Sequence, residues 1–437
     1  MWLRPRIGKC LAKIVIYPYQ EIDNMNKRWD KACGADVHKR FIDATILTSD
    51  GTKKHRRFLT NIDGLLAFRD WLIEEDCPVV AMESTGVYWI PINTVLEGIV
   101  QVQLANAYKI KHTPGKKTDI KDSEWIAELC INGMIEPSRI FPKEDRELRD
   151  LTRAREAIVN SRSQVKNRIH AVLDTANIKL SSVFSDLFGK SGIELVTGIV
   201  SGQSIEAIIS GTSNRWIKKK AEDIRQAVKG TLGTAQTFVI NEGLQVIKAI
   251  DKSVENIEAE ISSRMKAKTE DLKIAMSIPG IGFVAGSTIL AEIGDFRDFK
   301  TPDKLAAWTG IVSSVYQSAN KLSLGRITKQ GSKHLRWILV EVANAVIKVK
   351  GRNKLKSFFL RVKARQGFKK AIVALARKIL CILHHLLTNR ELYVEDGETK
   401  VKRSKVPKEN VSVTMTADEM IRILSEAGYV VSKPVLG

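Results

Sequence analysis

The order of strand and helix patterns between residues 32 and 135 most limits how this chain can fold. Three consecutive segments rich in β-branched and apolar residues predict strands: A-C-G-A-D-V-H, R-F-I-D-A-T-I-L-T and K-K-H-R-R-F-L-T. A helical pattern follows from about Asn61 to Ile73. Two buried-strand patterns, P-V-V-A-M-E and V-Q-V-Q-L-A, then alternate with helical patterns near 91–96 and 120–132. The sequence therefore predicts a mixed α/β domain in which three strands precede the first helix.

This order of strands and helices is that of an RNase H-like fold, and four acidic residues fall at informative places in it. Asp36 lies in the first strand and Glu83 ends P-V-V-A-M-E, while Asp119 and Asp122 begin a helix and share one face. Together they could form an oxygen cage for Mg²⁺ or Mn²⁺, and two such ions about 4 Å apart can clamp a phosphodiester. Asp119 could instead be only a helix N-cap and Asp122 a favourable first-turn acid. Any one of these acids alone is more often structural, but the set in this order favours a metal site.

Two long apolar stripes predict paired helices after residue 142. The first helix, 144–177, carries Leu148, Leu151, Ile158, Val165, Ile169 and Val172, and the second, 240–268, carries Leu244, Ile247, Ile250, Val254, Ile257, Ile261 and Met265. Steps of three and four residues are typical of a coiled-coil seam, so we expect an antiparallel stalk. The Ser/Gly-rich segment 178–238 between the helices gives no clear prediction.

The charge balance indicates a polyanionic partner. The chain has 70 Lys and Arg against 49 Asp and Glu, a formal charge of +21, and Lys321–Lys378 holds seventeen basic residues with Glu341 as its one acid. So much like charge is best neutralised by nucleic-acid phosphates. No run of 18 apolar residues exists, so we expect no membrane span. The five scattered cysteines form no C-x-x-C pair, which indicates neither zinc nor a disulfide framework and fits the cytoplasm.

Two further candidate segments lie on the N-terminal side of this basic region. S-I-P-G-I-G, followed by an Ala-rich helix, is similar to a helix-hairpin-helix whose Gly280 and Gly282 let backbone N–H groups approach a phosphate, although a plain loop is nearly as common. Ser318 lies in a polar, turn-like stretch from Gln317 to Lys321. Spacing alone does not separate it from Ser313, Ser314 or Ser323, and the segment contains no His–Asp pair to activate it.

Three signatures together resemble a known family. They are G-A-D-V-H-K; M-E-S-T-G-V-Y-W with K-T-D-I-K-D; and P-G-I-G through V-Y-Q-S-A-N and G-R-I-T-K-Q-G-S-K-H-L-R-W. From Cys33 to about Leu387 the chain resembles the DEDD-type transposases of bacterial and archaeal insertion sequences, described as bridge-RNA-guided serine recombinases. The resemblance implies a RuvC-like domain, a coiled-coil stalk and a C-terminal transposase domain.

The resemblance also implies roles for individual residues. The four family acids correspond to Asp36, Glu83, Asp119 and Asp122, and the nucleophilic serine corresponds to Ser318, which would form a covalent phosphoserine link. Family members often have Ser-Gly where this chain has Ser318-Ala319. A structured RNA from the element is expected to pair with donor and target DNA.

These observations predict a metal-dependent DNA recombinase with five segments. They are an N-terminal extension expected not to be native (1–31, with Met25 as the expected start), a RuvC-like domain (32–142), a helical stalk with an irregular insert (143–273), a mainly helical, basic transposase domain with the serine (274–390), and a tail (391–437) with a short helix near 417–427. Nucleic-acid contacts are expected at Gly280, Gly282, Arg326, Lys329, Lys333 and Arg336.

Other expectations concern assembly and alternatives. The long seams predict a homodimer or homotetramer that builds composite sites from Ser318 of one protomer and the acids of another. Trp308, Tyr316 and Trp337 could stack on bases, although such aromatics are more often core residues. Two alternative functions remain at this point: a metal-dependent Holliday-junction nuclease that uses water, and a non-catalytic nucleic-acid-binding protein.

Overall fold

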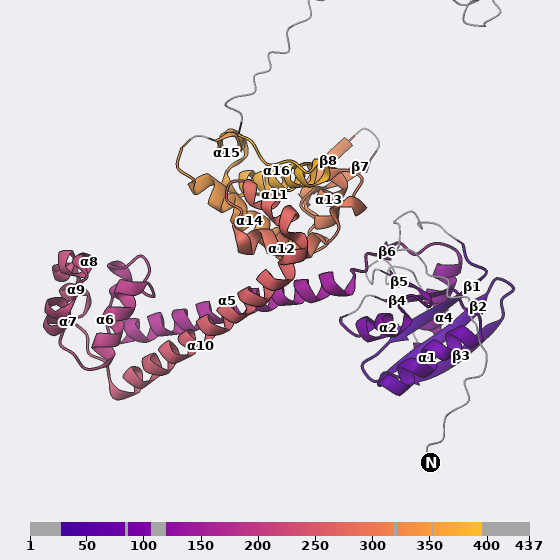
Figure 1. Ribbon diagram of the computed structural model, residues 1–437, viewed down its shortest axis with the longest axis horizontal. Helices are drawn as coiled ribbons and strands as arrows, with labels where there is room; N and C mark the ends of the chain where they lie inside the picture. Colours follow the sequence, from indigo (N-terminus) through magenta and orange to yellow (C-terminus); the bar gives the residue numbers. More distant parts are fainter. Residues whose placement is uncertain (1–27, 84–85, 106–118, 319–320, 352, 396–437) are drawn as a thin grey trace, which may run out of the picture.

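A six-stranded mixed sheet forms the N-terminal part of the chain in the computed structural model (Figure 1). Strands β1 (Lys31–Val37), β2 (Phe41–Thr48) and β3 (Lys53–Leu59) form an antiparallel meander. Strands β4 (Val79–Glu83) and β5 (Gln101–Ala105) continue the sheet in parallel with β1, and the short β6 (Pro137–Ser138) pairs antiparallel with β5. The strand order is β3-β2-β1-β4-β5-β6.

The structure describes residues 28–83, 86–105, 119–318, 321–351 and 353–395, and of residues 119–120, 316–318, 321, 322 and 324 only the backbone. The expected start at Met25 and the expected helix near 417–427 lie outside the described residues. So does most of the loop H-T-P-G-K-K-T-D that precedes Ile120.

Helices cover both faces of the sheet. On one face, α1 (Ile62–Glu74) and α2 (Trp89–Leu96) bury Phe68, Trp71 and Ile92 against Ala35 and Met82. On the other face, α4 (Asp119–Ile131) packs its apolar side on β1, β4 and β5. Successive strand residues point to opposite faces of the sheet, and both faces are covered by helices. The central strands are therefore apolar on both sides.

The predicted order of this domain is confirmed. The five predicted strands and three predicted helices are present, and their ends differ from the prediction by at most two residues. Strand β6 was missed, since its two residues lie in a segment that the sequence marks as a break. The architecture is a mixed α/β sheet domain compatible with an RNase H-like DEDD transposase.

Two long helices follow, α5 (Lys143–Thr175) and α10 (Thr234–Met265), which lie side by side (Figure 1). Their ion pairs join Glu147 to Arg264 (2.5 Å), Arg155 to Glu258 (2.7 Å) and Arg162 to Asp251 (2.8 Å). Because the partners advance along α5 as they recede along α10, the helices are antiparallel. The apolar stripes are buried or half-buried along this contact. That the pair supercoils stays a prediction.

The segment between the long helices was expected to be irregular, but it folds into a small helical cap. It contains a 3₁₀ turn, η2 (Leu180–Ser182), and the helices α6 (Lys190–Val200), α7 (Ile205–Gly211), α8 (Arg215–Lys219) and α9 (Ala221–Ala227). These elements share a core with the adjoining ends of α5 and α10, built on Ile169, Leu173, Leu195 and Ile240.

The C-terminal unit is mostly helical, as predicted. Its helices are α11 (Thr269–Ser277), α12 (Phe283–Ile293), α13 (Pro302–Thr309), α14 (Lys333–Lys348), α15 (Lys354–Gln366) and α16 (Phe368–Asn389), with 3₁₀ turns η3 (Lys266–Lys268) and η4 (Phe296–Asp298). The exception is a two-stranded hairpin of β7 (Ser313–Ser318) and β8 (Lys321–Ile327), whose strands the sequence analysis did not predict. The stretch from Gln317 to Lys321, predicted to be turn-like, lies at the tip of this hairpin. The domain limits proposed from the sequence remain predictions.

Helix α16 is the one helix of the described residues long and apolar enough to span a membrane by composition. Just over half of its most apolar window, 56%, is buried inside the protein. Its apolar residues, among them Leu375, Ile379 and Leu383, belong to the core of the C-terminal unit. A core helix of this kind passes the same composition test.

A buried carboxylate joins the stalk to the C-terminal unit. Glu292 of α12 is fully buried and accepts hydrogen bonds from Arg153 Nε (2.6 Å) and Nη2 (2.9 Å), with Arg149 Nη2 at 3.4 Å. Burial alone would raise the pKa of Glu292, but the hydrogen bonds from Arg153 and the charges of both arginines outweigh it, so the pKa is lowered. The carboxylate is therefore charged at neutral pH.

Removing this charge should destabilise the fold. Glu292→Gln leaves two half-buried guanidinium groups without their counter-ion, and we expect a loss of about 3 kcal/mol in the free energy of unfolding at pH 7. Because the folded pKa lies below the ordinary value of 4.5, the wild type should lose this contribution as the pH falls below about 4.5. Urea denaturation at pH 7 and pH 4 measures both effects.

The matched control is Glu206→Gln, which removes an exposed carboxylate bound to Arg225 on the surface of the cap. We expect little change, because exposed ion pairs contribute little. Equal stability of the Glu292→Gln variant and the wild type would contradict the assigned role of the buried pair.

Candidate active site

Two of the predicted acids lie at the carboxyl ends of neighbouring parallel strands. The register pairs Gly34 with Ala81 and Ala35 with Met82, so the next pair along is Asp36 of β1 and Glu83 of β4. Both acids fall on the side of the sheet that faces α4, because Gly34 and Ala81 lie two residues earlier on that face. The two carboxylates are therefore neighbours on one face, at the edge where both strands end.

Helix α4 runs antiparallel to β1 across this face. Its last residue, Ile131, accepts a hydrogen bond from Trp29 N just before β1 begins (3.1 Å). Near its other end, Ser123 Oγ is 2.7 Å from Thr45 Oγ1 of β2. The first turn, with Asp119 and Asp122, therefore lies toward the carboxyl ends of β1 and β4.

A glycine permits this close packing. A Cβ atom at Gly34 would lie 2.1 Å from Ser123 O and 2.4 Å from Ala127 N, so the helix backbone rests directly on the strand. Any larger residue would push α4 away from the sheet. The sequence G-A-D-V-H-K thus carries both an acid and the contact that brings the helical acids near it.

All four acids belong to segments that meet at one end of the sheet, but the structure describes the side chains of only three of them. Asp36 and Glu83 are half-buried, as is Asp122, while Asp119 is described only by its place as the first residue of α4. His38 Nε2 lies 3.0 Å from Asp36 Oδ2. Among side chains that the structure describes, no group of three or more His, Cys, Asp or Glu is close enough to hold a metal ion.

A fifth acid, Asp43, was missed by the sequence analysis. It lies opposite Asp36 in the β1–β2 register and is fully buried. Arg57 binds it through Nε (2.9 Å) and Nη2 (2.7 Å), and His55 Nε2 is 3.5 Å away. The sequence contained a sign of this residue, because an acid within the apolar strand F-I-D-A-T-I-L-T is unusual and indicates a paired, buried charge. Its charge is compensated within the protein by Arg57.

The candidate serine ends the first strand of the β7–β8 hairpin. The backbone pairs Ser318 with Lys321, so the serine lies at the tip of the hairpin, while its side chain is not described. Among its alternatives, Ser314 donates from Oγ to Arg326 O (3.2 Å) and Ser323 is exposed on β8. The hairpin and the carboxylate edge belong to different units of the chain (Figure 1).

The predicted nucleic-acid contacts divide into exposed and internal positions. Arg326, Lys329 and Lys333 are exposed around the hairpin and the first turn of α14. Arg336 is half-buried, and its Nη1 donates to three backbone carbonyls. Burial lowers its pKa.

The loop glycines and the aromatic candidates also differ in their surroundings. Gly280 has φ +88° and packs against α14, where a Cβ atom would lie 2.9 Å from Val346 Cγ2, while Gly282 has open space before α12. Trp308 packs against Phe299, with ring centroids 5.2 Å apart, and Trp337 is exposed. Tyr316 is described only by its backbone.

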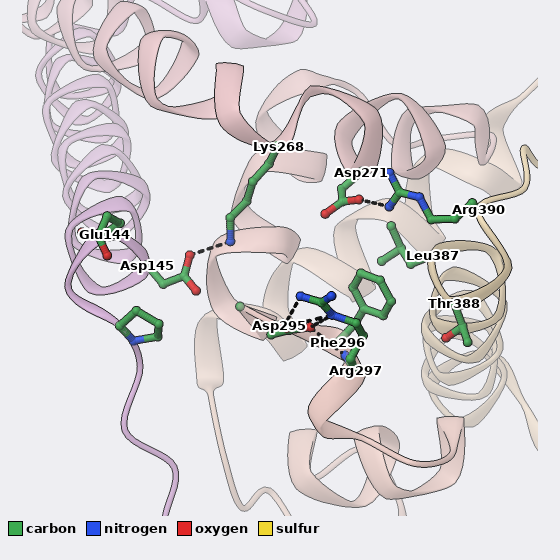
Figure 2. A pocket seen from close by; sticks show the side chains of 12 residues that line it. Glu144, Asp145, Lys268, Asp271, Asp295, Phe296, Arg297, Leu387, Thr388 and Arg390 are labelled. Carbon is green, nitrogen blue, oxygen red and sulfur yellow. Dashed lines mark hydrogen bonds and ion pairs between the residues drawn. The ribbon is translucent and has the colours of Figure 1, made fainter. Parts of the chain in front are cut away.

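A large hollow lies away from all of these residues (Figure 2). Its volume is about 890 Å³, and it lies between the start of α5, α11 and the end of α16. Most of its charged side chains pair with one another: Lys268 with Asp145 (2.5 Å), Arg297 with Asp295 (2.7 Å), and Arg390 with Asp271. None of the predicted site residues lines it, so it contributes nothing to the candidate site.

Comparisons with known proteins agree with this division into two parts. Residues 33–178 match a family model for DEDD transposases of the IS110 type, described as "Transposase". Residues 272–359 match a second model, described as "Transposase IS116/IS110/IS902 family". Together the two matches cover more than half of the chain, and they contain the carboxylate edge and the serine hairpin respectively.

Relatives that match more than half of the chain point the same way. The chain is 25% identical to the transposase for insertion sequence element IS1111A of Coxiella burnetii, over 72% of this chain and 79% of the relative. It is 24% identical to the transposase for insertion sequence element IS1328 of Yersinia enterocolitica, over 61% of this chain and 71% of the relative.

The fold, the carboxylate-bearing edge and these matches define a DNA transposase, an enzyme that cleaves and transfers DNA strands. The chain belongs to the IS110/IS116 family of insertion-sequence transposases, whose two domains it carries.

The contact between Gly34 and α4 can be tested directly. We expect Gly34→Ala to displace α4, to lower the free energy of unfolding by about 1–3 kcal/mol, and to reduce DNA cleavage more than tenfold in protein that remains folded. The control is Gly211→Ala in α7, where an added Cβ meets nothing within 4 Å. Wild-type cleavage and stability in Gly34→Ala would refute the close packing of α4 on β1.

Proposed function

We propose that this transposase is a site-specific recombinase that uses a metal-binding carboxylate set and a nucleophilic serine. The observation that best supports it is the orientation of α4, whose first turn lies at the carboxyl ends of β1 and β4. Asp36, Glu83, Asp119 and Asp122 then surround one edge of the sheet. Two of these acids end strands and two begin a helix, yet all four lie toward one edge of the sheet. Such a grouping is better explained by a binding site for a hard cation than by four separate structural roles.

Mg²⁺ or Mn²⁺ is the ion that we propose for this site. Carboxylate oxygens are the donors that such hard cations prefer, and the buried Asp43 beside them is already neutralised by Arg57. A divalent ion bound there would stabilise negative charge on phosphate oxygens during strand transfer. Asp36, Glu83, Asp119 and Asp122 would hold it, and the α4–β1 contact would keep the helical and strand acids in register.

Ser318 is proposed to attack the scissile phosphorus. A bond forms between Ser318 Oγ and phosphorus, the bond from phosphorus to a deoxyribose oxygen breaks, and that oxygen leaves with a proton. The serine proton passes to a neighbouring base, for which the carboxylate edge is the candidate. Attack by the freed hydroxyl of another strand on the phosphoserine reverses these steps and joins the strands.

The nucleic acids are proposed to lie along the basic hairpin side of the C-terminal unit. Arg326, Lys329 and Lys333 are exposed there and can contact phosphates, and Gly282 leaves the first N–H groups of α12 open to a backbone. Gly280 shapes the same loop, and Arg336 adds positive charge behind it. The partners are DNA and, by resemblance, a structured RNA from the element.

The separation of serine and acids supports shared sites between protomers. They lie in different units of one chain (Figure 1), and strand exchange needs more than one cut. A homodimer or homotetramer could bring Ser318 of one protomer to the acids of another. Each composite site then contains both parts.

The serine can be tested by trapping the covalent intermediate. We expect Ser318→Ala to abolish the protein–DNA adduct, detected as a denaturation-resistant band with labelled DNA, because alanine has no nucleophilic oxygen. Ser314→Ala and Ser323→Ala are the matched controls in the same hairpin and should retain the adduct. Cleavage by Ser318→Ala with free phosphate ends would instead support a nuclease that uses water.

Mixing inactive variants tests the carboxylates and the assembly together. Asp119→Asn removes a ligand charge and keeps the shape, so we expect a folded protein without cleavage in Mg²⁺ or Mn²⁺. Mixing it with Ser318→Ala should restore up to about a quarter to a half of cleavage, because one composite site can then contain wild-type serine and wild-type acids. Normal cleavage by Asp119→Asn alone would reject the metal set, and a dead mixture of variants that still assemble and bind DNA would reject shared sites.

A further inference from the structure

The serine hairpin is joined to its unit by two segments whose backbones contact each other at its base. The chain enters through Thr309, the last residue of α13, and residues 310–312, and it leaves through residues 328–332 before α14. Thr328 N donates to Val312 O (2.9 Å) and Lys329 N donates to Gly310 O (3.1 Å). Below the paired strands, the entering and leaving backbones are therefore tied to each other.

Two glycines let these backbones touch. Gly310 has φ +74°, and a Cβ atom there would lie 2.0 Å from Gln330 O. Gly331 has φ +76°, and its Cβ atom would lie 2.1 Å from Trp308 O. Both positions need glycine for backbone conformation and for space. This close contact brings several backbone carbonyl oxygens together, and their dipoles repel one another unless a hydrogen-bond donor lies among them.

Arg336 supplies that donor. From the first turn of α14, its Nη1 donates to Thr309 O (2.9 Å), Gln330 O (2.8 Å) and Gly331 O (3.0 Å). One acceptor belongs to the entering segment and two belong to the leaving segment, so a single guanidinium group binds both segments. A permanently charged donor makes stronger hydrogen bonds to carbonyls than a neutral one.

The helix that carries Arg336 is itself fixed to the stalk. Ser332 Oγ caps α14 by accepting from Leu335 N (3.1 Å), and His334 Nδ1 lies 2.6 Å from Glu156 Oε2 of α5. The base of the hairpin is thus held to α14, and α14 is held to α5. Among the residues that the structure describes, β7 and β8 pair only with each other and form a sheet of two strands.

We propose that Arg336 is a positioning residue that sets the direction of the β7–β8 hairpin and thereby the place of the serine at its tip. An isolated two-stranded hairpin is only marginally stable in water, so its orientation depends on its base. The effect on catalysis rests on the proposed role of Ser318, whereas the effect on the hairpin does not. Arg336 then acts mainly inside the protein, although its place in a basic segment predicts a phosphate contact.

Lys333 provides the matched control for this inference. It lies three residues before Arg336 in the same turn of α14, is exposed, and carries the same charge. Arg336→Gln and Lys333→Gln each remove one positive charge near the hairpin, but only the first removes the donor to the three carbonyls. Differences between the two variants therefore report the loss of the hydrogen bonds from Arg336 to the three carbonyls and not the loss of a charge.

The experiment combines hydrogen exchange with adduct kinetics on the full-length protein. In Arg336→Gln we expect amide exchange in β7 and β8 to rise at least tenfold, and the rate of adduct formation at saturating DNA to fall at least tenfold. DNA affinity should fall no more than it does in Lys333→Gln. Lys333→Gln should keep wild-type hairpin exchange, and because Lys333 is itself a proposed phosphate contact, its rate and DNA affinity are the reference against which Arg336→Gln is compared.

Other outcomes have defined meanings. If Arg336→Gln matches Lys333→Gln in hairpin exchange and in rate, Arg336 is a phosphate contact and the inference is wrong. If Arg336→Gln does not fold, Arg336→Lys replaces it, because a flexible ammonium group keeps the charge but not the planar fork. Wild-type exchange in that variant would also overturn the inference. If the wild type forms no adduct, the serine proposal fails while hairpin exchange still decides the role of Arg336.

Discussion

The buried carboxylate of Glu292 holds the parts of this transposase together. A charge without water must be compensated, and both compensating arginines come from the first half of α5. Next to this pair, Arg139 donates to Ile293 O and to Asp295 O (2.9 Å), which ties the segment after β6 to the end of α12. This ionic contact is one of several that join the two matched domains, together with the His334–Glu156 pair and the apolar core that Leu148 of α5 shares with α12. Residues 179–271, which lie between the two family matches, form mainly the cap and the returning stalk helix.

Much of the N-terminal domain could be predicted from sequence because its signals are local. Runs of β-branched residues buried on both faces give strands, and the apolar stripes of α5 and α10 give long paired helices. Strand β6 could not be predicted, since its two residues, one of them proline, become a strand only by pairing with Leu104 and Ala105. The β7–β8 hairpin was missed for a similar reason. Its segment S-S-V-Y-Q-S is mostly polar and shows no apolar alternation, so its strands depend on each other and on their base.

The candidate site was predictable as a set of residues and not as an arrangement. Asp36 and Glu83 could be placed at strand ends, but their adjacency depends on the parallel pairing of β1 with β4. The approach of α4 depends on Gly34, whose missing side chain has no periodic signal in the sequence. Asp43 was passed over because one polar residue in a strand pattern is usually read as solvent-facing, whereas here Arg57 and His55 from the edge strand compensate it. Neutralising partners from another strand cannot be inferred from local sequence.

The C-terminal signature G-R-I-T-K-Q-G-S-K-H-L-R-W shows why charge counting overstates the surface that is available to nucleic acid. Its cations separate by geometry: Arg326, Lys329 and Lys333 are exposed, whereas Arg336 satisfies backbone carbonyls. Elsewhere in the basic region Lys356 donates to Val349 O (3.0 Å), and Arg377 pairs with Asp303 (2.8 Å). A guanidinium group can serve as a structural donor because it carries five N–H groups in a fixed plane. The same residue type therefore builds the base of the hairpin and its outer surface, and only the positions of the acceptors distinguish the two uses.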